Sequence, residues 1–179
     1  MPLLTPRRTQ PVRLDSFDPT HVERVLSWVG SEHEAFRIAP RTPPPLTTDG
    51  ILRWGRVAGC TALQLVIVGE YVPVAYGEVN QLFSNRDEYW LGHLIVDPTR
   101  RGEGFGFELT RLLLHRAFAR LGATRVSLVV FPDNERAISV YKAAGMYCEG
   151  HEAQTFDSRG GLVERLLRMA ISRDDWYTS

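Results

Sequence analysis

A glycine-rich turn between an apolar run and an amphipathic segment constrains this chain more than any other feature. The apolar residues 91–96 end at Asp97-Pro98, and glycines follow at positions 102, 104 and 106. A segment with helical periodicity then covers residues 107–121. The pattern predicts a strand, a tight turn and a helix. The unpaired N–H groups of the turn and the positive end of the helix dipole suit an anion such as a diphosphate.

Two common phosphate-binding patterns are excluded by the residues around these glycines. The P-loop of nucleotide hydrolases ends in Gly-Lys-Ser or Gly-Lys-Thr, whereas Gly106 is followed by Phe107 and Glu108. The dinucleotide fingerprint Gly-x-Gly-x-x-Gly requires a different spacing from the regular interval of two found here. What remains is Arg-x-x-Gly-x-Gly, formed by Arg101, Gly104 and Gly106.

Length and charge favour a single globular domain without a polyanionic partner. We expect a flexible arm over residues 1–10 and one domain over residues 11–179. The 21 basic and 21 acidic residues cancel, so the basic footprint of a nucleic-acid-binding protein is missing. No apolar run reaches the length of a membrane span, and the first residues lack the apolar core of a signal peptide. Cys60 and Cys148 form no metal or redox spacing, so we expect a reduced cytoplasmic protein without a metal site.

The order of elements predicts an α/β fold with a mixed sheet. Three middle strands joined by short connections favour an antiparallel arrangement, whereas a crossover helix makes the next strand parallel to the one before the glycines. A hairpin is expected around residues 157–161. The expected strands are 11–17, 62–68, 72–79, 88–96, 124–131, 146–156 and 162–171, and the expected helices are 18–29, 47–56, 106–121 and 134–144.

A second motif lies downstream of the glycine-rich turn. Residues 134–145 read Asn-x-x-Ala-x-x-x-Tyr-x-x-x-Gly, and Asn134 and Tyr141 lie two helical turns apart, on one face. Both motifs, together with Val96 five residues before Arg101, resemble the GNAT superfamily of N-acetyltransferases. The resemblance implies a mostly antiparallel sheet with one parallel, splayed pair of strands, flanked by helices, and acetyl-CoA bound between the splayed strands. The family is often dimeric, so a homodimer is possible.

The resemblance also assigns residues to the cofactor. Main-chain groups of the strand before the turn hold the arm of the cofactor, the turn binds its pyrophosphate, and the downstream helix faces its sulfur. The residues so assigned are Leu94, Ile95, Val96, Arg101, Gly102, Glu103, Gly104, Phe105, Gly106, Asn134 and Tyr141. Asn134 also fits a helix N-cap, and Tyr141 also fits a core aromatic residue.

Acetyl transfer from a thioester to an amine requires a base and a proton donor. The amine has to lose a proton before it attacks, and the departing thiolate has to be stabilised. The resemblance assigns Tyr141 as the general acid. Glu78 and His93 fall on neighbouring antiparallel strands and are the candidate bases, Glu78 first. The alternative is that Glu78 faces solvent and His93 merely packs in the sheet. Glu34 is interpreted as a surface residue.

The sequence therefore predicts an N-acetyltransferase that moves an acetyl group from acetyl-CoA to a primary amine by direct attack in a ternary complex. A non-catalytic acyl-CoA-binding module and an acyltransferase using a longer acyl-CoA remain alternatives. The acceptor is a small-molecule amine or a protein N-terminal or lysine amine. In this fold residues 33–45 and 155–161 surround the acceptor, and they contain no dominant acidic cluster of the kind expected for a polyamine or an aminoglycoside.

Overall fold

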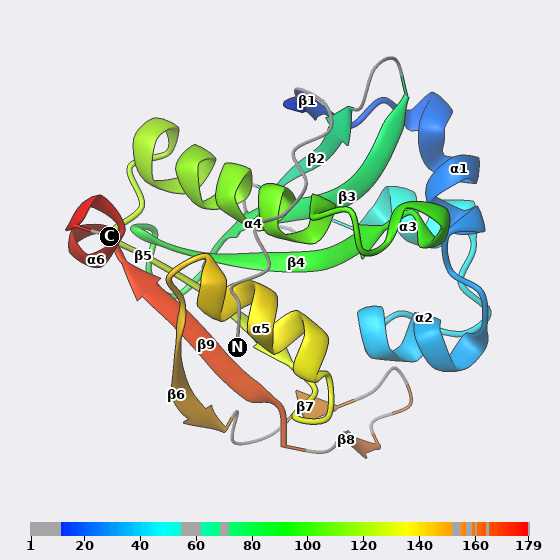
Figure 1. The fold of residues 1–179 in the computed structure, drawn as a ribbon. Helices are drawn as coiled ribbons and strands as arrows, with labels where there is room; N and C mark the ends of the chain where they lie inside the picture. The colour runs from blue at the N-terminus through cyan, green and yellow to red at the C-terminus, as the bar shows by residue number, and fades with distance from the viewer. Residues whose placement is uncertain are drawn as a thin grey trace.

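The computed structural model describes residues 12–54, 62–68, 72–151, 155–156, 159, 161–163 and 165–178. The expected arm at 1–10, Cys60 and most of the expected turn at 157–161 lie outside these residues. A seven-stranded sheet with the order β1-β2-β3-β4-β5-β9-β6 forms the centre (Figure 1). Its strands are β1 Arg13–Ser16, β2 Ala62–Val68, β3 Pro73–Gln81, β4 Glu88–Val96, β5 Arg125–Val130, β6 Tyr147–His151 and β9 Leu167–Ser172.

The pairing of these strands confirms the predicted fold class. β4 and β5 run parallel, and every other neighbouring pair in this sheet is antiparallel. The expected closing hairpin is present in the pairing of β6 with β9 and of two short strands, β7 Thr155–Phe156 and β8 Leu162–Val163.

Helices cover both faces of the sheet. α4 Phe105–His115, continued by a π-helical turn at Arg116–Arg120, packs with α5 Glu135–Ala143 over one face. The short helices η1 Pro19–His21, α1 Val22–Ser27 and α3 Thr48–Arg53 lie on the other. Side chains along β3 alternate between the two faces. Gly77 faces α4, because a Cβ at this position would lie 2.9 Å from Leu113. The side chains of the adjacent Tyr76 and Glu78 therefore point to the opposite face.

The parallel pair is short, which opens the sheet in its middle. β4 and β5 pair over three positions, Glu88 with Arg125, Tyr89 with Val126 and Trp90 with Ser127. Beyond Trp90 the two strands diverge (Figure 1), and no described strand pairs with the edge of β4 that faces β5. This confirms the predicted splayed pair.

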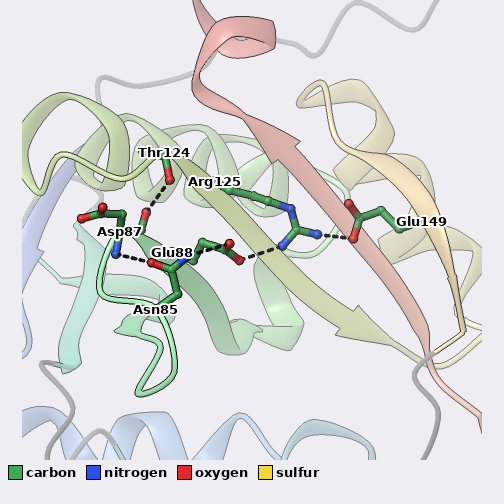
Figure 2. A network of polar contacts seen from close by, with 6 residues as sticks. All are labelled: Asn85, Asp87, Glu88, Thr124, Arg125 and Glu149. Carbon is green, nitrogen blue, oxygen red and sulfur yellow. Dashed lines mark hydrogen bonds and ion pairs between the residues drawn. The ribbon is translucent and has the colours of Figure 1, made fainter.

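A polar network fastens the closed end of this wedge (Figure 2). Arg125 of β5 donates to Glu88 of β4 at 3.1 Å and to Glu149 of β6. The N–H of Thr124 donates to the carbonyl of Asp87 at 2.7 Å. The hydrogen-bonded carboxylate of Glu149, assisted by Glu88, raises the pKa of Arg125. One guanidinium thus ties three strands together where the wedge begins.

Two helices were not predicted from the sequence. α2 Glu32–Ile38 has only seven residues, none of them buried, and its N-terminus is fixed by the Ser31 hydroxyl, which accepts from the Glu34 N–H. α6 Arg173–Thr178 is too short for a periodic pattern, and Trp176 in it stacks on Phe118 at 5.9 Å. The first predicted helix is divided into η1 and α1, and the helix predicted from 106 begins at Phe105. Among the described residues, no helix has the length and apolarity to cross a bilayer.

Candidate active site

The open end of the wedge forms a large cavity. It has a volume of about 1320 Å³ and is lined by the diverging parts of β4 and β5, the glycine-rich turn, α5 and the segment from α2 to α3. The cavity lining includes each residue of the predicted site except Glu103. The glycine-rich turn, the downstream helix and the candidate bases are therefore brought to one place by the fold.

The turn has the backbone geometry of an anion site. Gly102 and Gly104 have φ values of +94° and +92°, which side chains other than glycine rarely adopt. Gly104 is the N-cap of α4 and offers no side chain to the first helical N–H groups, so these N–H groups remain for a ligand. Gly106 lies inside the first turn of α4, where an added Cβ would be 3.9 Å from Val96 and from Val140. The turn therefore fits a diphosphate.

Two guanidinium groups flank this turn. Arg101 donates to Glu34 of α2 at 2.6 Å and more weakly, at 3.4 Å, to the carbonyl of Val96. Arg136 of α5 approaches from the other side, its Nη2 3.7 Å from the position of a Cβ on Gly102. Arg136 was not predicted, although it lies two residues after Asn134 in the second motif. The structure brings Glu34, interpreted from the sequence as a surface residue, to the turn.

Glu34 carries a negative charge at neutral pH. Burial raises the pKa of its carboxyl, but the N–H of Gly30 and the guanidinium of Arg101 outweigh burial and hold the pKa below its usual value. Glu103, in contrast, is turned to the half-buried Arg100, which donates to both of its carboxylate oxygens at 2.8 Å. The Glu103 side chain is thus engaged outside the cavity.

The second motif forms the opposite wall. Asn134 caps α5, since its Oδ1 accepts from the N–H of Ala137 at 3.2 Å. Tyr141 lies two turns further along α5 and lines the cavity. No described residue forms a hydrogen bond with its hydroxyl, and burial raises the pKa of Tyr141 to about 12. The phenol is therefore neutral throughout the physiological range.

Glu78 and His93 meet at the base of the wedge. Glu78 has no exposed surface, and the Nδ1 of His93 lies 3.1 Å from its Oε2, although the contact is bent rather than linear. Tyr76 and Asn80, on the same face of β3, donate to the carboxylate at 2.6 and 3.3 Å. Burial raises the pKa of Glu78, but His93, Tyr76 and Asn80 together hold it below its usual value. The alternative that Glu78 faces solvent is therefore wrong.

A bulge in β4 turns His93 toward the cavity. The register changes from Tyr76 opposite Ile95 to Glu78 opposite Gly92, so β4 contains one extra residue there. His93 itself has φ +50°, which costs a non-glycine residue about 1 kcal/mol. Its ring stacks on Trp54 at 4.1 Å and 13° and meets the Trp90 ring edge at 6.1 Å.

Trp54 is a site residue that the sequence did not single out. It follows α3 directly and falls within the helix predicted over residues 47–56. Its indole Nε1 donates to the hydroxyl of Thr42 at 2.9 Å, which fixes the plane on which the imidazole of His93 lies. A tryptophan in a short helix is usually a core residue, and nothing in the sequence around Trp54 indicated another role.

Comparisons with known proteins agree with this architecture. Residues 23–146 match the acetyltransferase (GNAT) family model. The spermidine N-acetyltransferase from Vibrio cholerae, solved with CoA and spermine, is 17% identical with a TM-score of 0.74, over 93% of this chain and 98% of that one. AAC(6')-Ib, solved with ribostamycin and coenzyme A, is also 17% identical with a TM-score of 0.74, over 94% and 97%. A putative acetyltransferase is 21% identical with a TM-score of 0.73, over 99% and 92%.

The family match covers well over half of the chain, so the protein belongs to the acetyltransferase (GNAT) family. It is a transferase, and acetyl-CoA is the cofactor of the family. This confirms the predicted family, fold, enzyme class and cofactor.

Proposed function

We propose that this protein transfers the acetyl group of acetyl-CoA to a primary amine by direct attack within a ternary complex. The observation that carries the proposal is the His93–Glu78 pair, which opens onto the same cavity as the glycine-rich turn and Tyr141. When bound, acetyl-CoA supplies an acetyl group activated as a thioester. The ammonium group first loses one proton, and the neutral amine nitrogen then forms a bond with the acetyl carbon as the carbon–sulfur bond breaks. The nitrogen loses a second proton, and the departing thiolate takes up one proton from solvent.

The glycine-rich turn holds the anionic part of the cofactor in this proposal. The N–H groups at the start of α4 and the guanidinium groups of Arg101 and Arg136 bind the diphosphate. The main chain of Leu94, Ile95 and Val96 has no partner in β5 and holds the arm of the cofactor. Asn134 contributes by fixing the start of α5, and thereby the position of Tyr141.

His93 takes a proton from the ammonium form of the acceptor, which leaves the neutral amine that attacks. An alkyl amine with a pKa near 10.4 is neutral in only about one molecule in 2,500 at pH 7, so assisted deprotonation matters. Glu78 has no exposed surface and cannot reach an amine directly. Because its carboxylate faces Nδ1 of His93, Nε2 is the nitrogen that meets the amine. Glu78 then acts as a positioning residue that stabilises the charged imidazole, and our order of the two candidate bases is reversed.

Tyr141 stabilises the departing sulfur. With its pKa raised to about 12, complete proton transfer to a thiolate of pKa near 8.5 is uphill by about 5 kcal/mol. The neutral hydroxyl is therefore better suited to donate a hydrogen bond to the sulfur as charge develops there. This narrows the predicted role of general acid to that of a hydrogen-bond donor to the leaving group.

An acceptor screen tests the proposed function. Acetyl-CoA is incubated with a panel of primary amines, and free thiol and acetylated product are measured for the native protein, His93→Gln and Tyr141→Phe. We expect amine-dependent thiol release that falls by about 10²-fold or more in His93→Gln, while CoA binds both variants normally. If all three proteins bind CoA and none of them transfers, the chain is a binding module. Propionyl-CoA and butyryl-CoA in the same assay test for a longer acyl group.

A further inference from the structure

The charges in the cavity bear on the acceptor, and this inference rests on the proposed function. We propose that the acceptor amine also carries an anionic group, a carboxylate or a phosphate, which is bound by Arg41 and Arg53. This differs from the polycationic amines named with the structural relatives, spermine and ribostamycin.

Positive side chains outnumber negative ones around the cavity. The arginines that line it are Arg37, Arg41, Arg53, Arg101, Arg136 and Arg168, and the carboxylates are Glu34, Glu78 and Asp133. Among the described residues of the lining, six guanidinium groups against three carboxylates leave a formal charge of +3. When the diphosphate is bound, its two negative charges offset two of these guanidinium groups, and the described lining still carries no excess of negative charge that would attract a polyamine.

The three carboxylates are also already engaged. Glu34 contacts Arg101 at 2.6 Å, Asp133 binds Arg37 through both oxygens at 2.7 and 3.0 Å, and Glu78 faces His93 at 3.1 Å. Each of these negative charges is therefore already matched by a cationic group or by the imidazole of His93, although the Asp133 side chain remains 69% exposed. The described part of the cavity therefore offers no unpaired carboxylate to a second or third ammonium group.

Arg41 and Arg53, by contrast, have no ion-pair or hydrogen-bond partner among the described residues, and both are exposed. Arg53 is the last residue of α3 and directly precedes Trp54, which stacks on His93. Arg41 directly precedes Thr42, which binds the Trp54 indole. The segment that supports the proposed base thus also carries the two free guanidinium groups.

This position separates the pair from the cofactor site. The glycine-rich turn already has Arg101 and Arg136 beside it, on β4–α4 and on α5. Arg41 and Arg53 come instead from the α2–α3 segment beside Trp54. A guanidinium group matches the planar, two-oxygen geometry of a carboxylate or phosphate. An acceptor held at its anionic end by Arg41 and Arg53 presents its amine to His93.

Matched amine pairs test this inference. The pairs are phenylalanine with 2-phenylethylamine, lysine with cadaverine, and O-phosphoethanolamine with ethanolamine; spermidine and kanamycin are added as polycations. We expect kcat/KM to be about 10-fold or more higher for the anionic member of at least one pair, and the third pair separates phosphate from carboxylate. The double variant Arg41→Gln/Arg53→Gln should lose this preference, because kcat/KM should fall much more for the amine with an anionic group than for the amine without one. Arg120→Gln, an exposed arginine outside the cavity, is the control.

Two results would overturn the inference without touching the proposed function. One is transfer to spermidine or kanamycin in preference to every anionic amine. The other is an anionic preference that survives the double substitution. If no amine is acetylated, the proposed function fails, and binding of the same pairs to the CoA-loaded protein decides the inference separately. Equal dissociation constants within every pair would then refute it, and a preference that depends on the two arginines would support it.

Discussion

Replacing Glu34 by glutamine should tighten the binding of CoA. Glu34 holds Arg101 at 2.6 Å, and the diphosphate has to compete for that guanidinium. Glutamine keeps an oxygen for the N–H of Gly30, to which Glu34 now bonds at 3.0 Å, and removes the charge. The variant therefore leaves α2 capped and Arg101 free.

The structure sets the size of this effect. The side chains of Arg101 and Glu34 are 38% and 29% exposed, and ion pairs of this kind contribute about 0.2–1 kcal/mol. Releasing that energy lowers the dissociation constant of CoA by about 1.4- to 5-fold. Because the pKa of Glu34 is held below its usual value, the carboxylate is charged at neutral pH. The difference between the proteins should disappear as the pH falls below that lowered pKa, where Glu34 is also neutral.

Isothermal titration with CoA at pH 7 and at two salt concentrations measures the effect. Glu32→Gln is the matched control, because it removes the same charge from the same helix without an ion pair to Arg101. We expect tighter binding for Glu34→Gln only, with a smaller difference at high salt. Unchanged or weaker binding in Glu34→Gln would refute the view that Glu34 competes with the cofactor for Arg101.

Three further substitutions test other parts of the site. Arg136→Gln should weaken CoA binding by about 10-fold in the same titration, because one charge-assisted hydrogen bond is lost. An unaltered affinity would contradict the proposal that Arg136 binds the diphosphate. Glu78→Gln should flatten the loss of stability in acid, measured by urea unfolding between pH 3 and 6. The lowered pKa of Glu78 means that its contribution is complete above the unfolded value of about 4.5 and is lost as the pH falls through the folded value. Gly92→Ala would place a Cβ against the Trp90 ring and should lower the free energy of unfolding by about 1–3 kcal/mol. We expect kcat to fall while the affinity for CoA is unchanged. A wild-type kcat would argue against a role for the Trp90–His93 contact.

The sequence predicted those parts of the site that depend on local chemistry. Gly102, Gly104 and Arg101 form a contiguous motif whose backbone demands can be read from residue type, and the Asn134 cap is equally local. The pairing of β3 with β4 also follows from their short connection, so the meeting of Glu78 and His93 was within reach. Gly92 was the one local hint of the bulge, but a φ of +50° at His93 depends on packing against Trp54 and Trp90.

Contacts between distant segments could not be predicted. Glu34 and Arg101 are separated by 67 positions, and Arg37 and Asp133 by 96. These two ion pairs place α2 at the open end of the wedge (Figure 1). Neither ion pair depends on a pattern within one element, and α2 is only seven residues long. The sequence therefore predicted the glycine-rich turn and the start of α5 better than the position of α2.

The central claim is that the glycine-rich turn binds the diphosphate of acetyl-CoA, and one comparison tests it most directly. Gly104→Ala and Gly122→Ala both force alanine into a left-handed conformation, at φ +92° and +75°, so both should cost about 1–2 kcal/mol of stability. Gly104 lies at the turn, whereas Gly122 lies at the far end of the α4 segment, outside the cavity. Titration with acetyl-CoA should show at least a tenfold weaker affinity for Gly104→Ala alone. Equal affinities for the two variants would contradict the account.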